Sequence, residues 1–220
     1  MIRAMDDGTT AADPDTLSAA LARSYPGARC ELLVRDPWDL LVAAILSART
    51  SDVQVNRVMA VLCEHFCGPE AYARLDHRQL AKIICKVPLY QQKARGIVEA
   101  ARRVLADHAG QVPQTMKQLA ALPGVGRKTA AVVLGNAFDI PAIAADVHVQ
   151  RIVRRLGWID RESAVDAEKA IARRFGPQYW VQLCHRLIRL GREHCRPLNP
   201  KCTTCPFGGQ CPKQGVLPPR

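Results

Sequence analysis

The chain has 220 residues, 48% of them hydrophobic, and a formal net charge of +11. This apolar content excludes a disordered protein, and the length allows one large domain or two small lobes with hydrophobic cores. Residues 1–140 carry 17 basic and 14 acidic side chains, whereas residues 141–220 carry 14 and 6. So basic a C-terminal part favours a polyanionic partner, most commonly nucleic acid, although a merely soluble basic protein would show the same balance.

The N-terminal stretch MIRAMDDGTTAADPDT is acidic and lacks the apolar region of a secretory signal. We therefore expect a frayed lead-in to the first helix. No segment approaches the roughly 18 uninterrupted apolar residues of a membrane helix. These features predict no membrane association and a cytoplasmic location, or a nuclear or organellar one in a eukaryote. Among these we favour the bacterial cytoplasm, at the nucleoid.

Along the whole chain the apolar residues recur mostly with helical spacing, and no alternating or β-branched run is long enough to predict a strand. The sequence predicts an all-α fold of roughly ten short helices, separated by Gly and Pro at sites such as Gly68-Pro69. The change in charge near Asp139–Pro141 marks the best boundary between lobes. The predicted helical segments are Pro14–Ser24, a stripe of Trp38, Leu41, Ile45 and Leu46, Val53–Phe66, Leu80–Ile84, Ala94–His108, Thr115–Leu122, Arg127–Phe138, His148–Leu156, Ala164–Phe175 and Val181–Leu190.

The stretch LPGVGRKTAAVVLGNAF, residues 122–138, joins a glycine-rich turn to an apolar helix. A P-loop needs a glycine directly before its lysine, but Arg127 precedes Lys128. A Rossmann fingerprint would need a glycine where Thr129 stands. What remains is helix, tight turn, helix, in which the glycines allow close backbone approach and the new helix offers N–H groups to an anion.

Nine cysteines are many for a reducing compartment, where structural disulfides are rare. Five of them lie in apolar or helical contexts and are best interpreted as small buried hydrophobes: Cys30, Cys63, Cys67, Cys85 and Cys184. The other four form CRPLNPKCTTCPFGGQC with the spacing C-x6-C-x2-C-x5-C: Cys195, Cys202, Cys205 and Cys211. Four thiolates in so short a loop predict a metal centre, either Zn²⁺ or a [4Fe–4S] cluster, and the spacing alone leaves both open.

Three segments of the chain, in the same order, resemble the endonuclease III family of helix-hairpin-helix DNA glycosylases. They are LPGVGRKTA (Leu122–Ala130), IAADVHVQR (Ile143–Arg151) and the cysteine loop. Weaker matches are ILSARTSD (Ile45–Asp52) and PLYQQKARGI (Pro88–Ile97). The resemblance spans most of the chain after about residue 40.

The resemblance implies two helical lobes with a DNA-binding cleft between them, and a [4Fe–4S] cluster on the four cysteines. The implied organisation is an N-terminal segment 1–29 packing with the cluster lobe, a helical barrel domain 30–140 with the hairpin at about 115–137, and an iron–sulfur domain 141–220 with the cluster loop 195–211. The implied partner is double-stranded DNA with damaged pyrimidines or abasic sites, bound by a monomer.

The implied activity is excision of oxidised pyrimidines, for which the nucleotide must be extruded from the duplex. Lys128 would displace the base and form a Schiff base with the opened sugar, after which β-elimination cuts the strand 3′ to the lesion. Asp146 matches the family's catalytic carboxylate. Asp before an apolar-periodic run also predicts a helix N-cap, and the two roles can coexist.

Other positions match DNA contacts of the family. The hairpin turn would hold a phosphate through backbone N–H groups. Leu89 would be an apolar wedge between bases, or else a loop leucine packed on the core. Arg49 stands where the family usually has glutamine, so the opposite-base preference is left open. His148 either touches DNA or stabilises its helix. The residues of the turn are Leu122, Gly124, Val125, Gly126 and Arg127.

Two other functions are weighed against this one. A monofunctional glycosylase, such as the adenine-removing relatives with the same cysteine loop, would lack a lysine at the hairpin position and would carry an additional C-terminal domain. A non-catalytic DNA-binding or redox-sensing protein would need neither Lys128 nor Asp146. We therefore favour a bifunctional glycosylase with AP lyase activity, with the cluster in a structural role.

Overall fold

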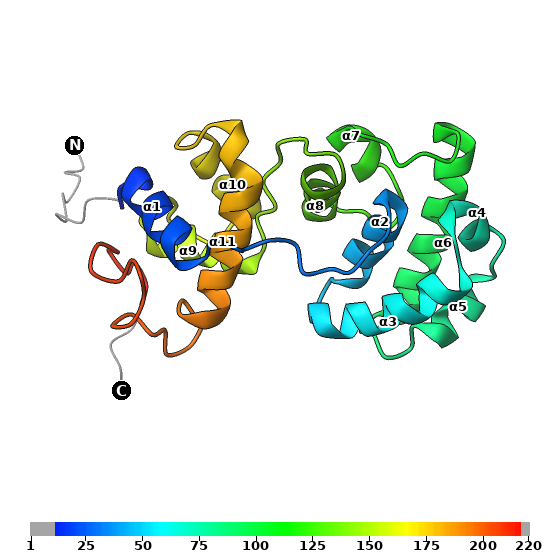
Figure 1. The fold of residues 1–220 in the computed structure, drawn as a ribbon, viewed down its shortest axis with the longest axis horizontal. Helices are drawn as coiled ribbons and strands as arrows, with labels where there is room; N and C mark the ends of the chain where they lie inside the picture. Colours follow the sequence, from blue (N-terminus) through cyan, green and yellow to red (C-terminus); the bar gives the residue numbers. More distant parts are fainter. Residues whose placement is uncertain (1–11, 217–220) are drawn as a thin grey trace, which may run out of the picture. The chain divides into compact units, whose positions relative to one another are not determined.

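The computed structural model describes residues 12–216. Within this range the chain is helical and contains no strand, which confirms the predicted all-α fold (Figure 1). The N-terminal lead-in predicted for residues 1–11 lies outside the described residues. The helices are α1 (Pro14–Ser24), α2 (Pro37–Leu46), α3 (Asp52–His65), α4 (Gly68–Ala73), α5 (His77–Ile83), α6 (Tyr90–His108), α7 (Met116–Ala120), α8 (Arg127–Ala137), α9 (Val147–Arg155), α10 (Ala164–Ala172), the 3₁₀ turn η1 (Pro177–Tyr179) and α11 (Trp180–Glu193).

The chain forms two compact units. One of them is the continuous segment Cys30–Ala142, which contains helices α2–α8 and is inserted between the two segments of the other. Helix α2 is its centre, because all but the first of its residues are buried. It packs against α3, α4, α6 and α8. A helix that is buried on every face forms only where neighbouring elements cover it all round.

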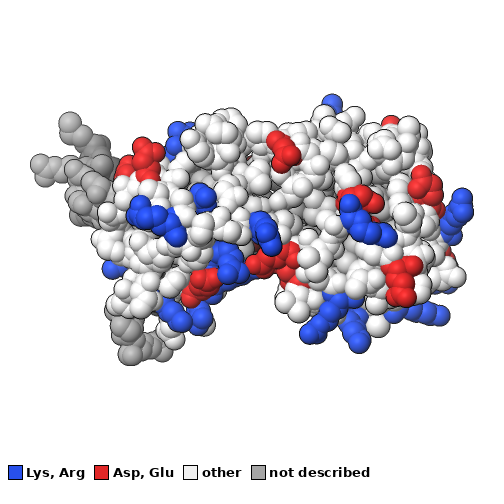
Figure 2. All heavy atoms as spheres, in the orientation of Figure 1, with Lys and Arg blue, Asp and Glu red and all other residues white. Residues whose placement is uncertain are grey.

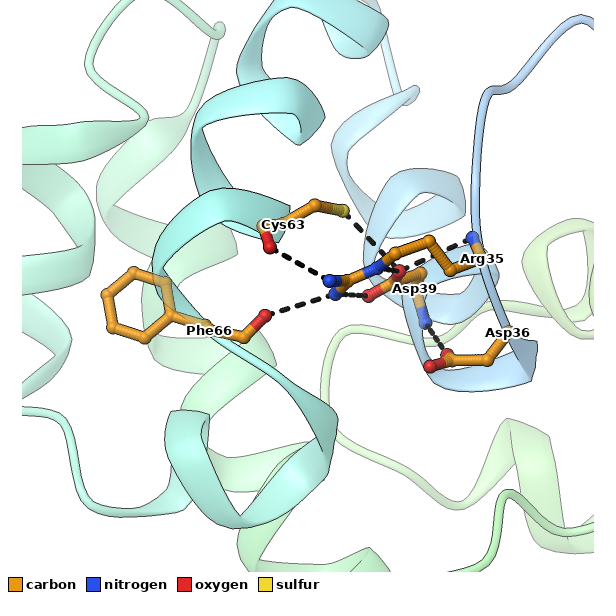
Figure 3. A network of polar contacts seen from close by, with 5 residues as sticks. All are labelled: Arg35, Asp36, Asp39, Cys63 and Phe66. Atoms are coloured by element: carbon orange, nitrogen blue, oxygen red, sulfur yellow. Dashed lines mark hydrogen bonds and ion pairs between the residues drawn. The ribbon is translucent and has the colours of Figure 1, made fainter.

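An ion pair between the partly exposed Arg35 and a buried carboxylate fixes the start of α2 (Figure 3). Asp39 is fully buried and accepts from the Arg35 guanidinium through both carboxylate oxygens, at 2.6 and 3.2 Å. The same guanidinium donates to the carbonyl oxygens of Cys63 and Phe66, at 2.8 and 3.1 Å. The donors and acceptors satisfy one another, which a buried charge requires. The network therefore holds the start of α2 against the end of α3.

The second unit is built from both flanks of that insertion, residues 12–29 and 143–216. Here α1 packs against α11, and α9 packs against α10 and α11. Trp158 donates from its indole nitrogen to the carbonyl oxygen of Ala12 at 2.9 Å, and Gln182 donates to that of Ala28 at 2.8 Å. These bonds join the N-terminal segment to residues that follow it by well over a hundred positions.

The predicted helix positions agree with the structure in most places, and α1 has the predicted bounds. The predicted break at Gly68-Pro69 lies between α3 and α4, but α4 itself was not predicted; it begins at Gly68 because proline is accepted in the first turn of a helix. A second correction concerns α6, which begins at Tyr90, four residues before the predicted Ala94. None of the helices in the described part of the chain combines the length and apolar composition that crossing a bilayer requires.

Candidate active site and cysteine loop

The turn between α7 and α8 presents the start of α8 without a cap. Gly124 has φ +76°, a conformation that glycine adopts without strain, and the Val125 N–H donates to the Leu122 carbonyl at 3.1 Å. Gly126 is the N-cap and has no side chain to accept from the first N–H groups of the helix. A helix start without a capping side chain is suited to an anion, since the first N–H groups of the helix and the positive end of its dipole coincide.

Lys128 is the second residue of α8 and is half-buried. Arg127 beside it is exposed, whereas the side chains of Leu122 and Val125 are buried in the unit. Of the predicted turn contacts, Leu122 and Val125 can therefore offer only backbone groups to a ligand.

The turn lies directly against helix α6. A Cβ built on Gly96 of α6 would be 3.2 Å from the Cα of Gly124, and one built on Gly124 would be 3.8 Å from a methyl group of Ile45 in α2. Glycine at both positions allows the two backbones to touch. The position of Lys128 is thus set by the contact between the turn and α6.

Arg49 and Leu89, the two predicted DNA-inserting residues, occupy separate turns in this unit and share one unusual backbone conformation. Both have φ +58°, and both side chains are exposed, Leu89 by 54%. A bond from the Thr50 N–H to the Ser47 carbonyl (3.0 Å) closes the turn that carries Arg49. A left-handed conformation costs a non-glycine residue on the order of 1–3 kcal/mol and persists only where the surrounding structure holds it.

Lys93 is a residue of this region that the sequence reading missed. It is 6% exposed, and its Nζ donates to the carbonyl oxygens of Leu46 (2.8 Å) and Ala48 (2.6 Å) and to Oγ1 of Thr50 (3.2 Å). Burial lowers the pKa of Lys93 from 10.5 to about 8. The signal was present in the sequence: with α6 extended to Tyr90, Lys93 falls on the same face as the buried Ile97.

A basic groove of about 720 Å³ lies next to the turn that carries Leu89, between α5 and the start of α6. Figure 2 has the same orientation as Figure 1. It shows several Lys and Arg side chains along the edge of the unit where Figure 1 draws α3 and α5. The basic residues that line the groove are His77, Arg78, Lys82 and Arg95.

Asp146 is in the second unit, as the N-cap of α9. Its Oδ1 accepts from the N–H groups of His148 (2.9 Å) and Val149 (3.0 Å). The predicted capping role is therefore confirmed. The other carboxylate oxygen takes no part in these bonds, and the side chain is only partly buried, so that capping leaves part of the carboxylate accessible.

His148 packs closely against α11 and contacts Arg151. A Cβ on Gly191 would lie 2.7 Å from His148 Nδ1, which also lies 2.9 Å from Nη2 of Arg151. Burial lowers the pKa of His148, and the positive charge of Arg151 acts in the same direction against the opposing Asp146. Arg151, buried itself, donates from Nε to the carbonyl oxygen of Cys195 at 2.9 Å. His148 thus lies in the contact between α9 and α11.

The four cysteines of the C-terminal loop surround one cavity, and all four are free thiols. Arg155, 7% exposed, donates from Nη1 to Cys195 Sγ (3.2 Å) and to the carbonyl oxygen of Arg196 (2.7 Å). A Cβ on Gly208 would lie 2.0 Å from the carbonyl oxygen of Cys202, so only glycine fits there. In residues 12–216 no three His, Cys, Asp or Glu side chains converge on one point closely enough to hold a single metal ion.

Lys128, Arg49 and Leu89 thus belong to the Cys30–Ala142 unit, and Asp146, His148 and the four cysteines to the other. Residues 42–177 match the family described as HhH-GPD superfamily base excision DNA repair protein. Endonuclease III of Bacillus subtilis is 40% identical over 190 residues, 85% of this chain and 86% of that protein. Endonuclease III of Escherichia coli K12 is 35% identical over 191 residues, 87% of this chain and 90% of that protein.

A solved structure of a trapped endonuclease III–DNA covalent intermediate has the same fold. It superposes with a TM-score of 0.85 at 37% identity and covers 90% of this chain and 94% of its own. The family match covers more than half of the sequence, and the relatives cover most of it, in agreement with the resemblance of the hairpin and the cysteine loop. The chain therefore belongs to the HhH-GPD superfamily of base excision DNA repair proteins and is a DNA glycosylase of the endonuclease III family.

Proposed function

We propose that this glycosylase is bifunctional: it removes oxidised pyrimidines from duplex DNA and cuts the strand as an AP lyase, acting as a monomer. The observation that carries the proposal is Lys128, a half-buried amine one residue beyond the uncapped start of α8. An anion site and a potential nucleophile in one helical turn can hold a phosphate and attack the sugar beside it.

In the proposed reaction the neutral amine of Lys128 attacks C1′ of the extruded nucleotide. The glycosidic bond breaks, and the base leaves with its electron pair and takes up a proton. Ring opening gives an imine between Nζ and C1′. The imine accepts electron density when a proton is removed from C2′, and the bond between C3′ and its phosphate oxygen breaks by β-elimination. Hydrolysis of the imine then releases the enzyme.

Asp146 is proposed to supply the negative charge for this sequence. A carboxylate near the sugar stabilises the positive charge that develops as the base departs, and it can accept the proton that the Lys128 ammonium must lose before its amine attacks. Capping fixes its orientation through Oδ1, since two N–H groups of α9 bind that atom. The α9 cap would thus serve the chemistry as well as the helix.

The remaining contacts would extrude the nucleotide. The hairpin turn would hold a backbone phosphate without reading sequence. Leu89 and Arg49 are proposed to enter the duplex, Leu89 as an apolar wedge and Arg49 as the group that fills the vacated space and donates to the opposite base. Both side chains are exposed on their turns, as insertion requires.

We also propose a [4Fe–4S] cluster on Cys195, Cys202, Cys205 and Cys211. Four free thiols around one cavity supply the ligand set that such a cluster needs, and their spacing resembles that of the endonuclease III family. Bound there, the cluster would serve as a rigid structural core. Arg155 would hold the loop by donating to a ligand sulfur and to the loop backbone.

Borohydride trapping tests the proposed function. The substrates are a duplex with one thymine glycol and a matched duplex with an abasic site, and the proteins are wild type, Lys128→Gln and Lys169→Gln. Lys169 is an exposed lysine of α10 and controls for the loss of one charge. We expect a covalent adduct on both duplexes with wild type and Lys169→Gln, and none with a folded Lys128→Gln that still binds DNA.

Other outcomes separate the alternatives. An adduct on the abasic duplex alone would leave a lyase with a different base substrate. Base release without any adduct would indicate a monofunctional glycosylase, and neither product with retained binding would indicate a non-catalytic protein.

A further inference from the structure

The turns that carry Arg49 and Leu89 are far apart in the sequence, yet one residue contacts both. The Lys93 side chain donates to the carbonyl oxygens of Leu46 and Ala48 and to the hydroxyl of Thr50. Its backbone N–H donates to the carbonyl oxygen of Leu89 at 3.0 Å. The last of these is the first hydrogen bond of α6, which Leu89 precedes as N-cap, so the Lys93 side chain ties the Arg49 turn to the start of the helix that carries Leu89.

The side-chain contacts bind the Arg49 turn on both sides. Ala48 precedes Arg49 and Thr50 follows it, and the Nζ distances to their oxygens are 2.6 and 3.2 Å. Leu46, the third acceptor, is the last residue of α2. There the ammonium faces the negative end of the helix dipole, which favours a positive charge. One buried charge therefore fixes where α2 ends and how the chain turns.

Both turns are strained, and strained turns persist only when their surroundings determine them. Arg49 and Leu89 share φ +58°, a conformation that non-glycine residues seldom adopt. With the Lys93 ammonium removed, the turn at Arg49 would keep only its local bonds, such as that from the Thr50 N–H to Ser47. Its exposed side chain would then sample several directions rather than one.

We propose that Lys93 is a positioning residue that presents Arg49 and Leu89 to DNA as one preformed unit, so that both side chains enter the duplex together. Given the proposed DNA-inserting role of these two residues, on which this inference rests, Lys93 acts on extrusion of the nucleotide and not on bond breaking. Two side chains that are already held in position also lose less conformational entropy on binding.

The inference is tested with a duplex that holds a tetrahydrofuran abasic analogue opposite 2-aminopurine. This base fluoresces more strongly when it loses its stacking neighbours, so the signal reports insertion without any chemistry. The variants are Lys93→Met, which keeps the length of the side chain but removes the charge, and Arg49→Ala with the double variant. Lys169→Met is the control for loss of one lysine.

At saturating protein we expect wild type and Lys169→Met to raise the fluorescence, and Lys93→Met to raise it no more than Arg49→Ala does. The double variant should give the same fluorescence as the single variants, because each single change already prevents the joint insertion of the two side chains. Single-turnover excision of thymine glycol by Lys93→Met should fall by about 10²-fold, the effect of a misplacement of about 1 Å, with much less effect on DNA affinity.

Thr50→Val provides a milder test should Lys93→Met fail to fold, since it removes only the hydroxyl acceptor. We expect an intermediate fluorescence response. A wild-type response from Lys93→Met and Thr50→Val, or additive effects of Lys93→Met and Arg49→Ala, would overturn the inference while wild-type excision upheld the proposed function. Absence of insertion and excision in the wild type would overturn both.

Discussion

Gly96 and Gly124 bring helix α6 and the hairpin turn into backbone contact: a Cβ on Gly96 would lie 3.2 Å from the Cα of Gly124. Alanine in place of Gly96 would favour the middle of a helix by about 1 kcal/mol but would push the turn outward. We therefore expect Gly96→Ala to change the free energy of unfolding by less than about 1 kcal/mol, because the two effects oppose each other.

The displaced turn carries Lys128, so the rate should suffer more than the stability. We expect strand cleavage by Gly96→Ala to slow by about tenfold, less than the effect of a full 1 Å misplacement. Single-turnover cleavage and thermal unfolding measure the two quantities. Gly27→Ala is the control, since a Cβ there would meet nothing within 4 Å. Equal losses of rate in the two variants would contradict the role of the contact.

The two roles of Asp146 can be separated by substitution. Asparagine caps helices as well as aspartate does, whereas alanine at an N-cap costs about 1 kcal/mol. We expect Asp146→Asn to keep the wild-type melting temperature but lose strand cleavage, and Asp146→Ala to lose both. Calorimetry with the cleavage assay measures this. An active Asp146→Asn would leave the residue with only its capping role.

Binding to DNA should weaken as salt is raised, because neutralised phosphates release counterions. Arg196 and Lys201 are exposed on the cysteine loop. If both contact phosphates, changing each to glutamine should reduce the slope of log K against log salt by about 0.9 per residue. The exposed pair Arg161 and Arg173, changed in the same way, is the control. An unchanged slope in the loop variant would remove the loop from the DNA interface.

Cys202→Ser tests the proposed cluster. We expect the variant to be colourless or insoluble, because a hydroxyl replaces one of four thiolate ligands. Iron content and the visible absorption spectrum are the measurements. Cys85→Ser, at an exposed position outside the loop, should stay brown and folded. A stable, brown Cys202→Ser would show that the ligands are misassigned.

The buried Lys93 gives the stability of the protein a specific pH dependence. Its folded pKa of about 8 lies below the ordinary value of 10.5, because burial disfavours the ammonium. Between these values the unfolded chain binds a proton that the folded chain has released, so the free energy of unfolding rises with pH over this interval. Below about pH 8 both states are protonated and this gain is absent.

We therefore expect wild type to gain stability relative to Lys93→Met as the pH rises from about 8 towards 10.5. Urea unfolding at several pH values measures the difference, which cancels the contributions of the other titrating groups. Parallel pH curves for the two proteins would contradict the lowered pKa.

The sequence correctly predicts helix boundaries that depend only on neighbouring residues. Asp13 and Pro14 form a cap and a first turn, and they predict the start of α1 correctly. Gly68-Pro69 marks the break before α4, but α4 was not predicted, because the same pair can stop one helix or begin the next and only the packing of α4 on α6 decides between them.

The candidate site likewise contains features that the sequence predicts and one residue whose role it does not. The spacing of the hairpin and of the cysteine loop can be read from the chain, as can the capping role of Asp146. The role of Lys93 cannot, because its three acceptors lie more than forty residues earlier in the sequence. Buried hydrogen bonds between distant segments depend on tertiary structure, and no local pattern encodes them.

The discontinuous unit, built from residues 12–29 and 143–216, has a consequence for biosynthesis. On the ribosome α1 emerges first but must wait for α11, its packing partner, while the whole of Cys30–Ala142 is translated. At about 5–20 residues per second this wait is on the order of ten seconds, long enough for the inserted unit to fold by itself. The nascent chain would thus contain the whole inserted unit, with the hairpin and Lys128, before α11 is synthesised, and the cysteine loop would follow α11.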